Sequence, residues 1–298
     1  MADNPKVQKH LLKKCLKPDS ETIGNWMARR ISRPMALQVT RIIAPLGIPA
    51  DLMTCFAWAT GLAAAVAFAF GQPWGWIVGA ILLQLWYLLD HVDGQLARLY
   101  ETESLDGAGL DYLMHHSLGI AVPLGVGFGL QHAGMEGSTT SSPWALPVAI
   151  AWALGLQLVV AVHDTRYKAF TKRLKRLKGQ LIVEGGSGAR PTPTAGPPLR
   201  PDRLVIWTAR KLCEQHVTMN LLTVLAILAL FWPAWIYQAS LVYLIVMAIV
   251  AWLVAIWSIG RSVLRRDAEA EFAAWYKTPP GHTLQKIDGW WVVESDES

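Results

Sequence analysis

Residues 90–115, DHVDGQLARLYETESLDGAGLDYLMH, place four ionisable side chains beside strongly apolar sequence. Asp90 and Asp93 are three residues apart, and Asp111 and His115 are four apart, so each pair shares one face of a helix. The short connection predicts that the two helices are antiparallel neighbours and that the four groups converge. Three carboxylates around one pocket repel each other unless a cation lies between them, and Mg²⁺ bound with substrate phosphates is a common solution. The stretch therefore predicts a Mg²⁺ (or Mn²⁺) site with Asp90, Asp93, Asp111 and His115 as ligands.

The composition of the whole chain is typical of a polytopic membrane protein. Of its 298 residues, 53% are hydrophobic and only 16% are charged, whereas soluble domains have about 25% charged residues. Six apolar runs approach the length of about 20 residues that crosses a bilayer. We therefore expect an all-α fold with six transmembrane helices, near Leu52–Phe70, Trp74–Leu89, Leu110–Leu130, Trp144–His163, Val217–Trp235 and Ala239–Ile259. The second run is short, and we expect its helix to continue through the acidic stretch.

The distribution of basic residues predicts the topology. Of the 27 Lys and Arg residues, nine precede the first predicted span, twelve lie between the fourth and fifth, and five follow the sixth. The loops GQPWG, QHAGMEGSTTSSP and FWPAWIYQAS contain none. Positive charge gathers on the cytoplasmic side of a membrane. We therefore expect an integral protein of the inner or plasma membrane, with both termini and the acidic stretch on the cytoplasmic side.

Three regions are predicted along the chain. Residues 1–48 form a cytoplasmic segment in which residues 20–45 read as a basic amphipathic surface helix containing Arg29, Arg30, Arg33 and Arg41. Residues 49–262 form the transmembrane domain, interrupted at about 164–215 by a flexible cytoplasmic loop whose Gly- and Pro-rich part is VEGGSGARPTPTAGPPLRPD. Residues 263–298 form a cytoplasmic tail, with a helix over RSVLRRDAEAEFAAWYK and an irregular last twenty residues.

Small and basic residues accompany the acids. Gly94 and Ala97 lie on or beside the acid-bearing face and leave room for a flat ring or a phosphate to approach the helix backbone. Arg98 is suited to hold a phosphate or to orient a carboxylate. Asp106, directly before Gly107, reads as a helix cap rather than a ligand.

This stretch resembles the signature of the CDP-alcohol phosphotransferase (CDP-alcohol phosphatidyltransferase) family, D-x2-D-G-x2-A-R-x8-G-x3-D-x3-D. Seven of the eight fixed positions match at the correct spacing: Asp90, Asp93, Gly94, Ala97, Arg98, Gly107 and Asp111. The eighth position is His115 instead of Asp. The predicted spans and the basic helix before the first span also resemble the family, so the likeness extends over most of residues 25–262 and fits least well at 164–215.

The resemblance implies a transferase that moves a phosphoryl-alcohol group from a CDP-linked donor, often CDP-diacylglycerol, to an acceptor hydroxyl and releases CMP, in phospholipid synthesis. It implies that the three aspartates hold one or two divalent ions on the pyrophosphate. By the same likeness, Gly94, Ala97, Arg98 and Gly107 bind the nucleotide part of the donor. The expected partners are a CDP-linked lipid donor, a small alcohol acceptor and membrane lipid. We also expect a homodimer and no nucleic-acid partner.

His115 is the point at which the sequence departs from the family, whose last Asp is assigned as the base that deprotonates the acceptor. A neutral imidazole is able to take this proton, so we predict that His115 is the catalytic base. Alternatives are an inactive relative that binds metal and nucleotide, a non-enzymatic membrane protein such as a transporter or scaffold, and the same fold acting on a CDP-linked polar alcohol. His116 is a fallback base, and His91 reads as structural.

A few other residues are weaker candidates. Thr54 could reach the nucleotide, although a Thr at the start of a helix more often caps it. His163, Asp164 and Arg166, at the end of the fourth predicted span, could pair with each other. The four arginines of the surface helix could line an acceptor or phosphate pocket or contact lipid.

Overall fold

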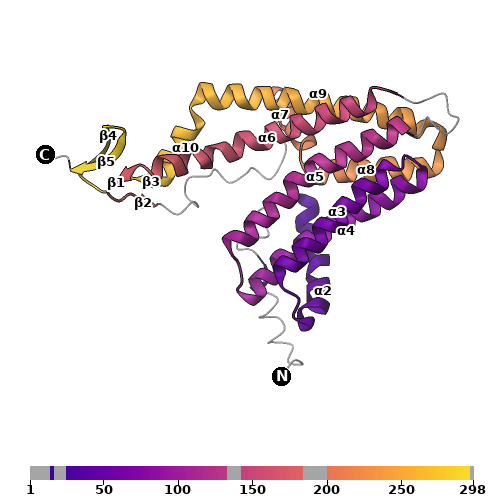
Figure 1. The fold of residues 1–298 in the computed structure, drawn as a ribbon, viewed down its shortest axis with the longest axis horizontal. Helices are drawn as coiled ribbons and strands as arrows, with labels where there is room; N and C mark the ends of the chain where they lie inside the picture. The colour runs from indigo at the N-terminus through magenta and orange to yellow at the C-terminus, as the bar shows by residue number, and fades with distance from the viewer. Residues whose placement is uncertain (1–13, 17–24, 133–141, 184–199, 296–298) are drawn as a thin grey trace. The chain divides into compact units, whose positions relative to one another are not determined.

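A computed structural model describes residues 14–16, 25–132, 142–183 and 200–295 of the chain. These residues are mostly helical (Figure 1) and divide into two compact units. The first unit is Met1–Gln157 with Trp207–Ala251, and the second is Leu158–Ile206 with Trp252–Ser298. The Gly- and Pro-rich segment of the predicted loop lies largely outside the described residues.

The helices follow the apolar runs. In chain order they are η1 (Ala28–Ser32), α2 (Arg33–Ile43), η2 (Ala44–Leu46), α3 (Ala50–Ala69), α4 (Pro73–Tyr100), α5 (Leu105–His132), α6 (Ala145–Leu174), α7 (Pro201–Leu212), α8 (Gln215–Phe231), α9 (Pro233–Arg265) and α10 (Asp267–Trp275). Figure 1 shows α3, α4 and α5 side by side. As expected, α4 continues through the acidic stretch to Tyr100. The basic segment before the first span is helical from Trp26 to Leu46, where surface-helix character was predicted.

The number of membrane spans is five or six. Five described helices are long and apolar enough to cross a bilayer: α3, α4, α5, α6 and the Trp235–Arg265 part of α9. The predicted span Val217–Trp235 corresponds to α8, which has only 17 residues and ends before Pro233. It reaches spanning length only if it is counted together with Arg203–Leu212, from which it is bent by 73°. The chain is therefore a polytopic membrane protein, and the sixth span depends on how this bent pair crosses.

Tight turns join the helices that carry the predicted site. Gly47 has a positive φ of 67°, a conformation that side chains other than glycine rarely adopt, and Pro49 then precedes α3. α4 ends at Glu101, which is left-handed, and its N–H bonds back to the last turn of the helix. Ser104 begins α5, because its Oγ accepts the Gly107 N–H at 2.9 Å. The cap is thus Ser104 and not Asp106, which is the second residue of the helix and is exposed.

Small residues bring α5 against α3. A Cβ atom at Gly125 would lie 2.2 Å from the Ala65 carbonyl oxygen, and one at Gly129 would lie 2.1 Å from that of Phe68. Glycine at these positions therefore allows the two backbones to touch. Membrane helices commonly pack in this way, because lipid offers no hydrophobic driving force between them.

The all-α prediction is wrong for the second unit, which contains two small sheets. Their strands are β1 (Leu177–Lys178), β2 (Ile182–Val183), β3 (Tyr276–Lys277), β4 (His282–Ile287) and β5 (Trp290–Ser295). One sheet has the order β1-β5-β4, with β1 parallel and β4 antiparallel to β5, and the other pairs β2 with β3. The last twenty residues are thus not irregular but largely a hairpin.

The hairpin has a local cause that the sequence contained. Asp288 and Gly289 lie between β4 and β5, and both have positive φ, 49° and 83°. An Asp-Gly pair with two positive φ values favours the two-residue turn that matches the twist of a β-hairpin. Residues 164–174 belong to α6 and residues 201–212 form α7, so the 164–215 segment is helical on both sides of its Gly- and Pro-rich part.

A cation between two aromatic rings organises the second unit. The Arg173 guanidinium lies 4.6 Å from the ring centroid of Phe272 and 4.3 Å from that of Trp291, and it bonds Glu269 at 2.5 Å. Contacts of this kind contribute about 0.5–2 kcal/mol each. They connect α6, α10 and β5 within this unit. The hydrogen bond and the charge of Arg173 hold the pKa of the Glu269 carboxyl below its ordinary value.

Candidate active site

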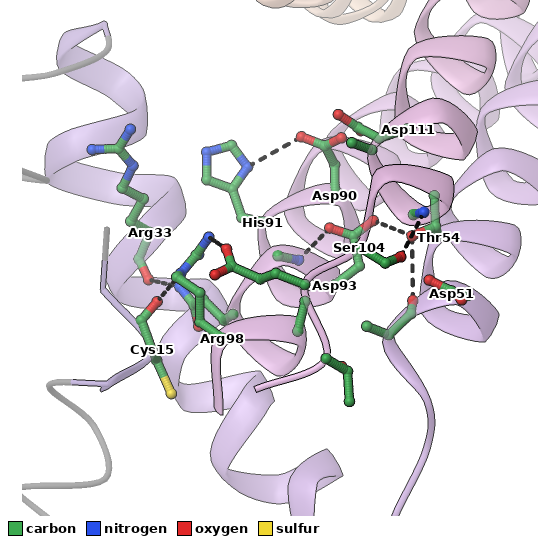
Figure 2. A pocket seen from close by; sticks show the side chains of 18 of the residues that line it. Cys15, Arg33, Asp51, Thr54, Asp90, His91, Asp93, Arg98, Ser104 and Asp111 are labelled. Atoms are coloured by element: carbon green, nitrogen blue, oxygen red, sulfur yellow. Dashed lines mark hydrogen bonds and ion pairs between the residues drawn. The ribbon is translucent and has the colours of Figure 1, made fainter. Parts of the chain in front are cut away.

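One cavity of about 500 Å³ gathers the predicted site residues. It lies in the first unit and is lined by residues of α2, α3, α4 and α5 and by Cys15 and Leu16 (Figure 2). All eight predicted metal, catalytic and nucleotide residues line it: Asp90, Asp93, Gly94, Ala97, Arg98, Gly107, Asp111 and His115. The convergence expected from the antiparallel helices is therefore present in the structure.

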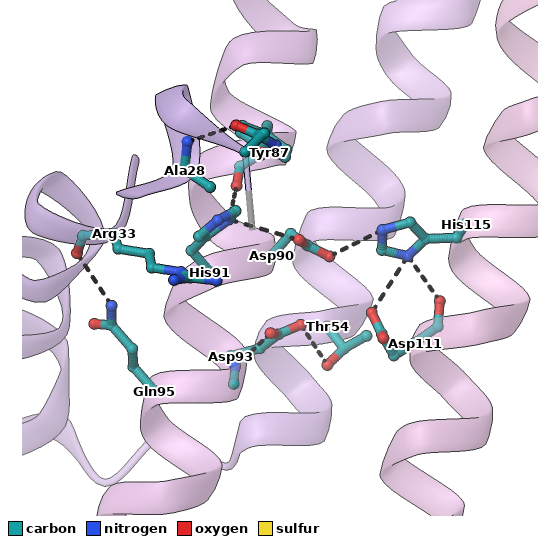
Figure 3. Close-up of polar contacts among 12 residues, drawn as sticks. Ala28, Arg33, Thr54, Tyr87, Asp90, His91, Asp93, Gln95, Asp111 and His115 are labelled. Atoms are coloured by element: carbon teal, nitrogen blue, oxygen red, sulfur yellow. Dashed lines mark hydrogen bonds and ion pairs between the residues drawn. The ribbon is translucent and has the colours of Figure 1, made fainter. Parts of the chain in front are cut away.

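Three of these residues form a compact group that could hold a metal ion. Asp90, Asp111 and His115 each offer one ligand atom, and these atoms lie within 4.8 Å of one another. His115 Nε2 is 3.5 Å from Asp90 Oδ1, and His115 Nδ1 is 3.3 Å from Asp111 Oδ1 (Figure 3). Two carboxylates and an imidazole make a donor set that suits a divalent cation. The three residues therefore fit a divalent metal ion.

The orientation of the His115 ring follows from its contact with the preceding turn. Its Nδ1 lies 3.0 Å from the Asp111 carbonyl oxygen. A carbonyl can only accept a hydrogen bond, so Nδ1 carries a hydrogen, and in the neutral ring the lone pair is then on Nε2. The Nε2 atom is the one directed towards Asp90 on the neighbouring helix. The Trp86 ring meets the imidazole edge to face, with 5.7 Å between centroids.

Asp93 lines the same cavity but is not part of the group of three. Its side chain is buried, and Oδ2 accepts a hydrogen bond from Thr54 Oγ1 at 2.8 Å. The other carboxylate oxygen accepts the backbone N–H of Gly94. These two contacts turn Asp93 towards α3, whereas Asp90 faces α5. The structure thus brings together three of the four predicted ligands, and Thr54 contacts the fourth.

Three of the predicted nucleotide residues, Gly94, Ala97 and Arg98, lie in the last turns of α4, and the fourth, Gly107, lies in the first turn of α5. Arg98 Nε donates to the Cys15 carbonyl at 2.8 Å, and a guanidinium nitrogen lies 3.9 Å from Glu103. A Cβ at Gly94 would come within 3.5 Å of that guanidinium. A Cβ at Gly107 would be 3.1 Å from Asp51 Oδ1, closer than most real contacts. A side chain at Gly107 would therefore press on the wall of the cavity.

Sequence reasoning did not assign several residues that line the cavity. His91, read as structural, lies on the cavity wall, with Nδ1 2.9 Å from the Tyr87 carbonyl oxygen. Of the four arginines in the surface helix, only Arg33 lines the cavity among the described residues, and burial lowers the pKa of its guanidinium. Asp51 and Cys15 had no distinguishing signal, because their position depends on how α3 and the N-terminal segment meet α4.

The weaker candidates His116, His163, Asp164 and Arg166 do not line the cavity. His116 is turned away from the cavity and bonds Gln157 at 2.9 Å. His163 Nδ1 lies 3.5 Å from Asp164, but Arg166 pairs with Asp267 at 3.5 Å and Glu271 at 3.4 Å. Thus only the first two of that predicted trio contact each other. Arg166 instead forms ion pairs with two residues of α10 within the second unit.

A comparison with known protein families gives a match over the segment that contains the candidate site residues. Residues 48–183 match the family model described as CDP-alcohol phosphatidyltransferase, and this segment includes the helices that carry the candidate site. The similarity to the CDP-alcohol phosphatidyltransferase family is therefore confirmed for this segment, which is less than half of the chain. Among curated proteins, none matches the chain.

Two solved structures are similar to the chain, both of a phosphatidylinositol phosphate synthase from Mycobacterium tuberculosis. The structure with CDP-DAG bound is 20% identical, with a TM-score of 0.44, and the match covers 80% of this chain and 93% of that one. The structure in complex with manganese and citrate is 19% identical, with a TM-score of 0.42, and the match covers 80% of this chain and 88% of that one.

Proposed function

We propose that this protein transfers a phosphoryl-alcohol group from a CDP-linked lipid donor to the hydroxyl of a small alcohol and releases CMP. The observation that carries the proposal is the grouping of Asp90, Asp111 and His115 on the wall of a cavity that also contains the remaining signature residues. The family to which residues 48–183 belong supports the reaction class. The alternative donor, a CDP-linked polar alcohol, would use the same residues.

The carboxylates of Asp90 and Asp111 are the proposed first ligands of a divalent ion, Mg²⁺ or Mn²⁺. Such an ion, when bound, would neutralise charge on the pyrophosphate and on the leaving CMP. Asp93 is held beside them by Thr54 and completes the acidic wall. Arg98, with Gly94, Ala97 and Gly107, would bind the nucleotide end of the donor, because Arg98 supplies a phosphate-binding guanidinium.

His115 is the proposed base. Its Nδ1–H is bonded to the Asp111 carbonyl, so Nε2 has the lone pair that can take the proton of the acceptor hydroxyl. The acceptor oxygen would then form a bond to the donor phosphorus as the bond from that phosphorus to the CMP oxygen breaks. The proton remains on His115 until solvent removes it. The same Nε2 atom could instead bind the metal, and the two roles have different signatures.

The orientation in the membrane also remains a proposal. The charge distribution places both termini, the cavity and the 164–215 segment on the cytoplasmic side. A water-soluble CDP group and a small alcohol would reach the cavity from there, while the acyl chains of the donor stay in the bilayer. We retain the homodimer as a prediction that size-exclusion chromatography with light scattering can measure.

The experiment is an assay of the purified protein in detergent micelles. It is incubated with CDP-diacylglycerol, a panel of small alcohols and Mg²⁺ or Mn²⁺, and CMP is measured. We expect release that stops in excess chelator and is nearly abolished in Asp90→Asn and Asp111→Asn. Asp106→Asn is the matched control, because Asp106 is on the same helix as Asp111 but is exposed and does not line the cavity.

Three results would contradict the proposal. Full CMP release in excess chelator would show that the reaction needs no metal ion. A loss of activity in Asp106→Asn equal to that in Asp111→Asn would show that the substitutions act on the helix in general. A wild-type protein that binds the donor and the metal without releasing CMP would support the inactive relative. Release with a CDP-linked polar alcohol but not with CDP-diacylglycerol would keep the reaction and change the donor.

A further inference from the structure

Two glutamine side chains contact the backbone of α5 at consecutive residues beside the proposed base. Gln215, the first residue of α8, donates through Nε2 to the His115 carbonyl at 2.6 Å. Gln157 on α6 donates through Nε2 to the His116 carbonyl at 2.9 Å. All of these residues belong to the first unit. Two helices thus hold one turn of a third by its main chain.

The amide orientation at Gln157 is determined by its partners. The His116 carbonyl can only accept, so the group that faces it is the amide nitrogen. The amide oxygen then faces His116 Nδ1 at 2.9 Å, which therefore carries a hydrogen. His116 is consequently bonded at both its ring and its carbonyl by one side chain. This accounts for His116 without a role in proton transfer.

Gly119 makes room for both amides. A Cβ at this position would lie 2.9 Å from Gln157 Nε2 and 3.5 Å from Gln215 Nε2. Gly119 also follows His115 by four residues, so its N–H is the intrahelical partner of the same carbonyl that Gln215 contacts. The absence of a side chain at Gly119 is therefore what exposes the main chain of this turn to donors from outside the helix.

The turn needs such support because its own sequence is a weak helix former. Pro123 lies inside α5 and has no N–H, so the carbonyl four residues earlier, at Gly119, loses its intrahelical bond. Glycine at that position adds further backbone freedom. The backbone hydrogen bonding of α5 is thus weakened one turn after His115, while the proposed chemistry requires that the His115 ring keep one position against Asp90.

The Gln215 contact differs from ordinary packing between membrane helices. Its carboxamide makes a bond to the His115 carbonyl, and its Oε1 is buried with no hydrogen-bond partner among the residues that the structure describes. Burying an amide oxygen without a partner is unfavourable. An apolar side chain at this position could join the two helices without burying an unpaired amide oxygen. The presence of Gln215 therefore indicates that its hydrogen bond to the His115 carbonyl has a role of its own.

We propose that Gln215 and Gln157, admitted by Gly119, are positioning residues that hold the His115 ring in place through the main chain of α5. The role of His115 in transfer rests on the proposed function, whereas its position is a property that can be measured separately. The ring keeps its Nδ1–H on the Asp111 carbonyl and its Nε2 towards Asp90 only while this turn is held.

The test compares Gln215→Met and Gln157→Met with Gln84→Met. Methionine keeps the length of the side chain and removes the donor. Gln84 is the matched control, because its Nε2 also joins two helices, bonding Asn220 at 3.2 Å and Thr223 at 3.0 Å, but it does not line the site cavity. The readouts are kcat and donor KM for CMP release, and the ¹⁵N chemical shifts of the His115 ring in ¹⁵N-histidine-labelled protein, assigned with His115→Ala.

We expect Gln215→Met to lower kcat by about 10–100-fold, the usual effect of removing a residue that orients a ligand or catalytic group. Donor KM should not change, and the His115 Nδ1 signal should move towards that of a ring without its hydrogen bond. Gln84→Met should leave the kcat and the signal as in the wild type. Unchanged kcat and shifts in Gln215→Met, or equal losses in Gln84→Met, would overturn the proposal.

Gly119→Ala provides a second variant that should fold. Its methyl group meets the far end of a flexible side chain, so the fold can accommodate the methyl group by displacing the Gln157 amide. If it acts by displacing that amide, it should add almost nothing in a Gln157→Met background, which a double-mutant cycle measures. Additive losses would contradict this mechanism. If the wild type releases no CMP, the proposed function fails, and the His115 shifts in the variants still decide whether the glutamines hold the ring.

Discussion

Thr54 Oγ1 on α3 lies 2.8 Å from Asp93 Oδ2 on α4, and both side chains are buried. The contact holds the one signature aspartate that stays outside the compact group of Asp90, Asp111 and His115. The signature aspartates therefore have two different environments. Asp90 on α4 lies near Asp111 on α5, whereas Asp93 is oriented by its hydrogen bond to Thr54 on α3. Thr54 thereby becomes part of the acidic wall, although it lies outside the signature.

The first prediction concerns this hydrogen bond. Thr54→Val removes the donor without changing the shape of the side chain, and a hydrogen bond to a charged group contributes about 1.5–3 kcal/mol. We expect kcat/KM for CMP release to fall roughly 10–100-fold, since each 1.4 kcal/mol is a factor of ten. Thr54→Ser keeps the hydroxyl and should retain most of the activity. Equal losses in the two variants would show that packing, not the hydrogen bond, is responsible.

The second prediction separates the two roles open to His115. If it is the base, His115→Ala should lose on the order of 10²–10⁴ in turnover, the usual contribution of a positioned acid–base group. Its affinity for Mn²⁺, measured by electron paramagnetic resonance, should then be nearly unchanged. A fall in Mn²⁺ affinity that accounts for the whole loss would make it a ligand instead.

His115→Asp is the companion variant, because it restores the residue that the family signature has at this position. We expect it to recover part of the activity lost in His115→Ala. An His115→Ala enzyme with wild-type turnover would show that the proton leaves by another route. Because His116 is held by Gln157 at ring and carbonyl, it is not expected to replace His115.

The third prediction is the topology. Single cysteines are placed by Gln72→Cys, between α3 and α4, and by Lys286→Cys, in β4, after Cys15, Cys55 and Cys213 have been replaced. Because the loop at Gln72 lacks Lys and Arg, a membrane-impermeant thiol reagent added outside intact cells should label the Gln72→Cys variant. It should label the Lys286→Cys variant only after the cells are opened. The reverse pattern would place the cavity on the outer side.

The fourth prediction is the pH dependence of the second unit. Arg173 lowers the pKa of Glu269 in the folded state, so the ion pair stabilises the fold above the unfolded pKa of about 4.3 and this stability is lost as the pH falls below it. The pair is partly exposed, and such pairs contribute about 0.2–1 kcal/mol. The urea midpoint at which the ¹⁹F signal of fluorotryptophan-labelled Trp291 shifts should therefore decrease between pH 6 and pH 3.

Glu269→Gln is the control for this measurement. It removes the titrating group but keeps a hydrogen-bond acceptor for Arg173. Its urea midpoint at pH 6 should be lower than that of the wild type, and the decrease on acidification should be smaller. A decrease of the same size in both proteins would show that the Arg173–Glu269 pair is not the cause of the pH dependence.

The sequence by itself determined the features that depend on local spacing. The apolar runs predicted the spanning helices, because a bilayer-crossing helix has to satisfy its backbone internally and is apolar along its length. The spacing of Asp90, Asp111 and His115 predicted that they converge, because helical periodicity and a short loop leave two neighbouring helices few arrangements. The family resemblance was visible in the same residues and is confirmed for residues 48–183.

Only the tertiary structure decided the features that depend on where separate helices meet. Thr54 reaches Asp93, and Gln157 and Gln215 reach α5, across separations of 39, 41 and 100 residues, which no local pattern records. The all-α expectation missed the two small sheets because their strands are short, and the Asp288-Gly289 turn is a weak signal beside six strongly apolar runs. Local periodicity therefore identified the residues of the acidic cluster, and packing between helices decided which side chains orient them.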